Sequence, residues 1–170
     1  MEKQGELIKM KVTLYSDGSA RGNPNGPGGY GCILHYTDSK GELHVREYSA
    51  GYKQTTNNRM ELMGVITGFE ALTKPCEVTV VSDSKYVTDA FNQNWIDSWV
   101  KNNWRTAGKK EVKNIDLWQR LLEAMKPHKA EFIWVKGHAG HPENERCDEL
   151  ATQAADGDNL LDDSVGAMLQ

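Results

Sequence analysis

The order in which strand and helix patterns follow one another restricts this chain more than any other feature. Segments 11–17, 30–37 and 43–52 read as strands joined by short loops, so they are expected to be antiparallel neighbours. Helix and strand patterns then alternate to the end of the chain. A meander followed by helix–strand units predicts an α/β fold, in which a mixed sheet carries helices on its faces.

The fourth strand determines the predicted strand order. Residues 77–83, EVTVVSD, form a nearly continuous β-branched run, which is typical of a strand buried in a parallel pair. A helical pattern precedes it, beginning near Asn58 and ending before Pro75. A right-handed crossover through that helix puts the fourth strand beside the first, and a fifth strand at 130–135 completes a five-stranded sheet of order 3-2-1-4-5. Further helices are expected at 84–92, 116–125 and 142–155.

Length and composition indicate one soluble domain. We place it at residues 1–156, and the acidic stretch 157–170 has the weak periodicity of a loosely ordered tail. No apolar run approaches the ~18 residues of a membrane span, so we expect a cytoplasmic protein with no membrane contact. The sequence gives no sign of an obligate oligomer, so we also expect a monomer with no obligate protein partner. Three scattered cysteines without a C-x-x-C motif predict neither a disulfide framework nor a zinc site. His138 and His141 lack further ligands at zinc spacing.

The net charge of −4 conceals a polarity along the chain. Residues 101–113 carry five cations against one acid, whereas residues 143–163 carry eight acids against Arg146 alone. The five cations are Lys101, Arg105, Lys109, Lys110 and Lys113. A basic segment in an acidic protein indicates one localised anionic partner, although a solvated surface loop explains the same charges.

Aspartates at the ends of two predicted strands are the first candidates for chemistry. Asp17 and Asp83 each close an apolar run in the pattern S-D-[GS], and adjacent parallel strands put them about 5 Å apart. Two anions at that separation need a cation, or one of them must be protonated. Each also has an ordinary explanation, since Asp17 followed by glycine suits a turn and Asp83 suits the N-cap of the next helix.

Glu61 and Asp148 also have two interpretations each. The run TTNNRMEL matches a capping box in which Glu61 reaches back to Asn58, and the helix dipole favours an acid in the first turn. Alternatively, a helix that opens beside the first and fourth strands brings Glu61 to Asp17 and Asp83. Asp148 flanks the apolar stripe of the last helix, or is one more acid on an acidic helix.

Five segments of the chain together resemble the bacterial type 1 ribonucleases H. They read YSDGSARGNPNGPGGYG, AGYKQTTNNRMELMGVI, VVSDSKYV, KNIDLWQRL and WVKGHAGHPENERCDELA, in the family's order and at its spacing. The resemblance covers roughly residues 8–155. It implies the ribonuclease H-like fold with the 3-2-1-4-5 sheet. It also implies an endonuclease that hydrolyses the RNA strand of RNA–DNA hybrids and leaves 5′-phosphate and 3′-hydroxyl ends.

The same resemblance implies a metal-dependent active site. Asp17, Glu61, Asp83 and Asp148 match the family's metal-binding acids, which hold two Mg²⁺ ions that Mn²⁺ can replace. His138, in KGHAGH, matches the family's auxiliary catalytic histidine. Hard carboxylate oxygens suit both metals, and the ions of a two-metal site lie about 3.5–4 Å apart.

The resemblance further implies a substrate-binding surface that reads 2′-hydroxyl groups across the minor groove of the hybrid. The residues matched to the minor groove are Asn23, Asn57, Asn58 and Lys85. Thr56 and Lys101 are matched to a pocket for a DNA phosphate. In the segment that resembles the family's basic protrusion, we expect Trp95 to touch substrate. Trp99 and Trp104 are expected to be mainly structural, with Trp104 kept as a substrate-binding candidate.

The chain departs from the family pattern in three places. Its glycine-rich loop reads GNPNGPGG with Asn25 added, which can shift Asn23 by one residue. Lys85 replaces a common glutamine, which predicts tighter but less discriminating groove contact. Asn102 and Asn103 make the protrusion less cationic than is usual, which predicts modest affinity.

Two rival functions fit the sequence less well. The loss of any one carboxylate would have favoured a hybrid-binding module without catalysis, but all four are present. Other two-metal nucleases of this fold, such as resolvases and integrases, lack the TTNNRMEL and GNPxGPGG elements.

Overall fold

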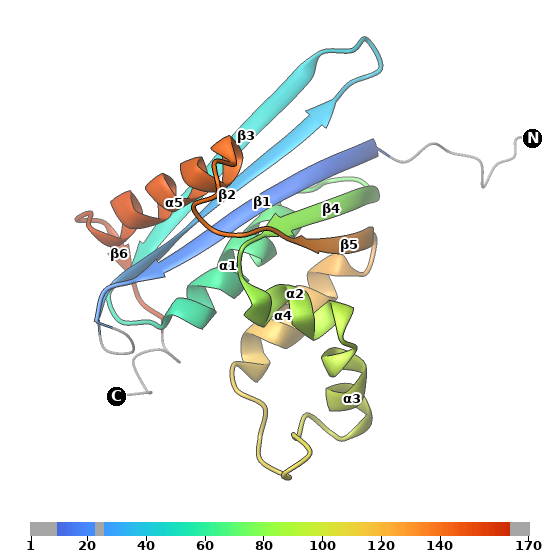
Figure 1. Ribbon diagram of the computed structural model, residues 1–170, viewed down its shortest axis with the longest axis vertical. Helices are drawn as coiled ribbons and strands as arrows, with labels where there is room; N and C mark the ends of the chain where they lie inside the picture. The colour runs from blue at the N-terminus through green and yellow to red at the C-terminus, as the bar shows by residue number, and fades with distance from the viewer. Residues whose placement is uncertain (1–9, 23–25, 164–170) are drawn as a thin grey trace, which may run out of the picture.

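The computed structural model describes residues 10–22 and 26–163, which form one sheet with helices on both faces (Figure 1). The strands are β1 (Met10–Ala20), β2 (Gly28–Thr37), β3 (Leu43–Tyr52), β4 (Cys76–Ser82), β5 (Lys129–Trp134) and β6 (Leu160–Leu161). The helices are α1 (Asn57–Glu70), α2 (Lys85–Asn92), α3 (Trp95–Lys101), α4 (Ile115–Met125) and α5 (Pro142–Ala155).

The sheet has the order β5-β4-β1-β2-β3-β6. The strands β1, β2 and β3 are antiparallel neighbours, and β4 and β5 run parallel to β1. The predicted order 3-2-1-4-5 is therefore confirmed, with β6 as a short additional strand at the β3 edge.

The parallel register of β1 and β4 determines where the strand-end aspartates lie. Pairing runs from Met10 opposite Cys76 to Ser16 opposite Ser82, so Asp17 and Asp83 are the next residues on each strand. Beyond this point β1 continues to Ala20, paired only with β2. Asp17 therefore lies inside a strand rather than at its end, and the predicted loop 20–29 is shorter than expected because β2 begins at Gly28.

The helices divide between the two faces of the sheet. In Figure 1, α5 crosses one face over β1, β2 and β3, while α1 lies against the other face with α4 beside it. The core between β1, β4 and α1 is fully buried. It includes Leu14, Leu62, Ile66 and Val80. This apolar layer holds α1 against the end of the sheet where the two aspartates lie.

The tryptophan-rich segment forms a projection. In Figure 1, α3 and the residues that follow it extend away from the sheet. Trp99 packs edge-on to the fully buried Trp118 of α4, with ring centroids 5.4 Å apart, and Trp104 lies 6.3 Å from Trp99. Val112 is buried and its amide donates to the Trp104 carbonyl. The tryptophan cluster thus anchors the basic segment 101–113 to the body of the protein.

The described part of the predicted tail is packed against the domain, not loosely ordered. Residues of β6 pair with Gly51 and Tyr52 of β3. Asp163 then reaches Arg59 of α1, whose side chain is only 2% exposed, and accepts two hydrogen bonds from it at 2.8 and 3.0 Å. Residues 164–170 lie outside the described part of the chain, as does Asn25.

Arg59 has a second carboxylate partner in Asp116 of α4, at 2.9 and 2.8 Å. The guanidinium lowers the pKa of the Asp116 carboxyl, and Thr55 donates to Asp163 at 2.7 Å. One buried cation therefore links α1, α4 and the chain after β6.

Two further features concern membrane-spanning helices and the cysteines. Within residues 10–22 and 26–163, no helix has the length and apolar character needed to cross a bilayer. All three cysteines, Cys32, Cys76 and Cys147, are buried free thiols.

We expect Asp163→Ala to lower the free energy of unfolding by about 2–3 kcal/mol, because it deprives a buried guanidinium of one carboxylate. The matched control is Asp162→Ala. That side chain is 83% exposed and lies 3.6 Å from Lys53, so its removal should cost less than about 1 kcal/mol. Urea unfolding followed by circular dichroism compares the two, and equal losses would contradict the role of the Arg59 network.

Candidate active site

Three carboxylates from different elements converge at one end of the sheet. Asp17 of β1, Glu61 of α1 and Asp83, which follows β4, each offer an oxygen within 4.8 Å of the others. Asp17 and Glu61 are buried, whereas Asp83 is half-buried. Asp148 of α5 lies close enough for its charge to act on Asp17 and Glu61. The structure therefore brings three of the four predicted acids within ligand distance of one another, with Asp148 near them.

Gly18 allows Glu61 to reach Asp17 and Asp83. A Cβ at Gly18 would lie 2.5 Å from the Glu61 nitrogen and 2.7 Å from the Met60 carbonyl carbon, so any side chain here would push α1 away from β1. The Gly18 amide also donates to Asp17 Oδ1 at 2.9 Å. The alternative that Asp17 and Gly18 form a turn is thus wrong, because the glycine is needed for close packing of helix on strand.

The caps of α1 and α2 leave the acids free for other roles. Thr56 is the N-cap of α1, and its hydroxyl accepts from the Arg59 amide at 3.1 Å. Glu61 is the fifth residue of the helix, so the predicted capping box centred on Asn58 is wrong. Ser84 caps α2 by accepting from the Val87 amide at 3.3 Å, and the alternative role of Asp83 as that cap is also wrong.

The electrostatics of the cluster favour bound cations. Burial, and next the charge of Asp83, raise the pKa of Asp17 to about 8. Burial also holds the pKa of Glu61 well above its ordinary value, with Asp17 and Asp83 adding to the effect. Such carboxyls remain partly protonated unless a cation balances them.

The carboxylate oxygens of the cluster suit a hard divalent metal ion. Glu61 Oε1 is buried and has no hydrogen-bond partner among the residues that the structure describes, although a buried carboxylate oxygen normally has one. The converging ligands are all carboxylate oxygens, which suit Mg²⁺ and Mn²⁺. Asp17, Glu61, Asp83 and Asp148 could therefore hold such ions.

The loop between β5 and α5 packs against this cluster. A Cβ at Gly137 would lie 2.7 Å from Asp83 Oδ2, so the loop backbone touches the carboxylate. His138 follows directly, is exposed, and has a φ of 56°, in the left-handed region that a non-glycine residue seldom adopts. The fold thus keeps His138 in the loop that borders the carboxylates.

The predicted substrate-binding residues occupy three places. Thr56, Asn57 and Asn58 lie at the start of α1, one turn before Glu61, and Lys85 is the first residue of α2, just after Asp83. Lys101 ends α3. Trp95 is exposed at the start of α3, whereas Trp99 and Trp104 pack against the core. Asn23 lies outside the described residues.

The sequence analysis missed Trp134, the last residue of β5. Its indole nitrogen donates to the Asp83 carbonyl at 2.9 Å, and the Lys85 ammonium lies 4.7 Å from its ring centroid. The available signal was its position: it ends the strand beside β4 and precedes the KGHAGH loop.

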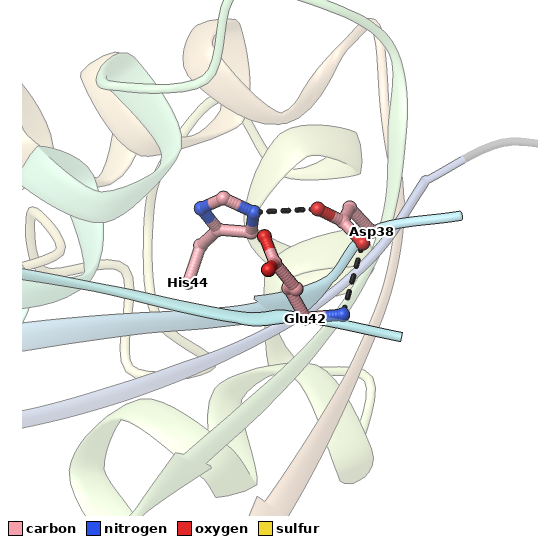
Figure 2. Close-up of side chains that lie close together, drawn as sticks. All are labelled: Asp38, Glu42 and His44. Atoms are coloured by element: carbon pink, nitrogen blue, oxygen red, sulfur yellow. Dashed lines mark hydrogen bonds and ion pairs between the residues drawn. The ribbon is translucent and has the colours of Figure 1, made fainter. Parts of the chain in front are cut away.

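A second group of potential ligands, Asp38, Glu42 and His44, lies in the turn between β2 and β3 (Figure 2). Asp38 Oδ1 accepts from the amides of Lys40 and Glu42 at 2.8 and 2.9 Å, and Oδ2 lies 2.9 Å from His44 Nε2. The His44 contact, and next the Glu42 amide, lower the pKa of Asp38. These bonds close the turn, so folding alone accounts for this group.

Metal-free protein should become less stable as the pH rises from about 4 to about 8. Asp17 has a pKa of about 8 in the folded protein, against 3.8 for an ordinary aspartate, so the folded state binds more protons in this window and loses stability as they leave. Asp17→Asn should therefore raise the free energy of unfolding at pH 8 in EDTA by about 1 kcal/mol or more.

Urea unfolding at pH 5 and pH 8, with EDTA or with Mg²⁺, tests this expectation. Mg²⁺ should stabilise the wild type more than Asp17→Asn at pH 8, because the ion binds only the folded carboxylate cluster. Stability that rises with pH in EDTA, or equal stabilisation of both proteins by Mg²⁺, would contradict the assigned electrostatics.

Comparison with known proteins agrees with this geometry. A sequence model of the RNase H family matches residues 9–156. The chain is 65% identical over 156 residues to a ribonuclease H of Lachnoclostridium phytofermentans, covering 92% of this chain and 99% of that one. It is 56% identical over 154 residues to a ribonuclease H of Edwardsiella ictaluri, covering 91% and 95%.

A solved ribonuclease H structure also resembles this chain. The crystal structure of LC9-RNase H1, described as a type 1 RNase H with the type 2 active-site motif, superposes with a TM-score of 0.81 at 32% identity. The match covers 94% of this chain and 80% of that one. The chain therefore belongs to the ribonuclease H family.

Proposed function

We propose that the protein hydrolyses the RNA strand of RNA–DNA hybrids, using two Mg²⁺ ions held by Asp17, Glu61, Asp83 and Asp148, and leaves 5′-phosphate and 3′-hydroxyl ends. The observation that carries the proposal is the convergence of Asp17, Glu61 and Asp83, with Asp148 near them, in a member of the ribonuclease H family. Family membership supports cleavage of RNA in hybrids, and the carboxylate geometry supports a metal-dependent route.

The acids are carried by rigid elements, which suits ligands that must keep a fixed separation. Asp17 lies in the paired strand β1, Glu61 in α1 and Asp148 in α5, while Asp83 is bordered by the Gly137 backbone. Because burial and mutual repulsion raise the pKa of Asp17 and of Glu61, metal binding displaces protons. Bound Mg²⁺ supplies Lewis-acid stabilisation of charge at the scissile phosphate and lowers the pKa of the attacking water.

His138 is the proposed proton-transfer group. It is exposed in the loop whose preceding residue, Gly137, touches the Asp83 carboxylate. Imidazole both donates and accepts a proton, which suits transfer to the departing 3′-oxygen.

The start of α1 is the proposed reader of the minor groove. Asn57 and Asn58 carry amides that donate and accept hydrogen bonds, one helical turn before Glu61. Glu61 is proposed to accept a hydrogen bond from the 2′-hydroxyl beside the scissile phosphate, which a DNA strand lacks. The Thr56 hydroxyl accepts from the Arg59 amide, and its hydrogen remains available to a DNA phosphate.

The projection is the proposed binding surface for the DNA strand. All five of its cations are exposed: Lys101, Arg105, Lys109, Lys110 and Lys113. Such contacts release counterions, so hybrid binding should weaken as salt rises. Trp95 offers an exposed ring beside them for packing on deoxyribose, and Lys101 joins Thr56 as the proposed phosphate contact.

Incubation with labelled RNA–DNA hybrid, duplex RNA and duplex DNA, each with Mg²⁺ or EDTA, tests the proposal. We expect cutting of only the RNA strand of the hybrid, and only with Mg²⁺. Asp17→Asn should lower kcat by about 10²–10³-fold while retaining hybrid binding, because it removes a ligand but no substrate contact. Asp38→Asn, which alters the other carboxylate group, is the control and should keep full activity. Equal cutting of duplex RNA, or none at all, would reject the proposal.

His138→Ala should lower kcat by about 10²-fold with little change in KM, because it removes proton transfer and not binding. His141→Ala is the matched control, since His141 is an exposed histidine of the same loop that precedes α5. Steady-state kinetics on the hybrid compares them, and an equal effect of the two substitutions would rule out a specific role for His138.

A further inference from the structure

Trp134 connects a proposed metal ligand to a proposed substrate contact. Its position in β5 is opposite Ser82, the last residue of β4, and the Val135 amide donates to the Ser82 carbonyl at 2.9 Å. From this position the indole N–H reaches the Asp83 carbonyl at 2.9 Å. The Lys85 ammonium lies over the same ring, 4.7 Å from its centroid.

Trp134 and Lys85 both lie where the local environment disfavours their residue type. The Trp134 side chain is 42% exposed, although so large an apolar ring gains most from burial. Lys85 is the first residue of α2, where the helix dipole disfavours a cation. Groups placed against local preference occur mainly where function requires them. An indole face within 6 Å stabilises an ammonium, which offsets part of the unfavourable placement of Lys85.

We propose that Trp134 is a positioning residue of the active site. Through its N–H it fixes the Asp83 backbone, and hence the direction in which the Asp83 carboxylate meets a metal ion. Through its ring it holds the Lys85 ammonium at the rim of the carboxylate cluster, facing the anionic backbone of the hybrid. The inference rests on the proposed function, in which Asp83 binds metal and Lys85 binds the hybrid.

Three substitutions separate the two contacts. Trp134→Phe keeps a ring beneath Lys85 but removes the N–H, whereas Trp134→Leu removes both. Lys85→Met removes the cation and keeps the side chain's length. Ile133→Leu is the control, because Ile133 is the exposed neighbour in β5 and points to the opposite face of the sheet. Thermal unfolding of each variant verifies that it is folded.

The Asp83 contact is tested by Mg²⁺ titration calorimetry without nucleic acid, together with kcat. Trp134→Phe should bind Mg²⁺ about tenfold more weakly and lower kcat about fivefold, as expected when a group that orients a metal ligand is lost. Its hybrid Kd in EDTA should stay within about twofold of the wild type, because the ring remains. Wild-type Mg²⁺ affinity and kcat in Trp134→Phe would overturn the Asp83 contact.

The Lys85 contact is tested by hybrid binding in EDTA over a series of KCl concentrations. Trp134→Leu should raise Kd about two- to fivefold in the wild-type background and have no effect in the Lys85→Met background. An equal effect in both backgrounds would overturn it. A wild type that binds but does not cut the hybrid contradicts the proposed catalytic function alone, since the calorimetry and the binding cycle still decide whether Trp134 positions its neighbours.

Discussion

Mutual repulsion among the carboxylates of Asp17, Glu61, Asp83 and Asp148 is the constraint on which the rest of the structure depends. Charge repulsion would push these carboxylates apart, so other contacts of the fold must hold them together. The parallel register of β1 and β4 ends one residue before Asp17 and Asp83 and so places the two aspartates side by side. The contact of Gly18 with the α1 backbone adds Glu61. The apolar layer between α1 and the sheet opposes the repulsion, and protons or a bound cation remove the remainder.

A buried cation stabilises the same helix turn that carries the site. Arg59 lies two residues before Glu61 and is held by Asp116 and Asp163. Because Arg59 also donates its amide to Thr56, the cap of α1 and its buried ion pairs meet in one turn. The chain after β6 therefore supports the start of α1, where Asn57 and Asn58 lie, although it is distant from them in sequence. Stability and the proposed substrate contacts share one structural element.

The sequence predicted the features that depend on chain direction and side-chain pattern, and missed those that depend on distant approach. The β-branched run 77–83 and the crossover rule were enough for the strand order and for the closeness of Asp17 and Asp83. The cap of α1 was misplaced because TTNN offers four capping residues in succession. The two-residue strand β6 has no pattern of its own, and its contacts are with β3 and, through Asp163, with Arg59, both distant in the sequence.

The contact with Trp134 also bears on Lys85, which stands where a glutamine is common in the family. An amide at that position reads donors and acceptors, whereas an ammonium adds charge that every nucleic-acid strand attracts. A flexible lysine would therefore add affinity without direction. The indole ring lies beneath the Lys85 ammonium, and the indole N–H donates to the Asp83 carbonyl. Under our proposal the ring restricts the ammonium to the rim of the carboxylate cluster, where it attracts the hybrid backbone while the carboxylates stay available to metal.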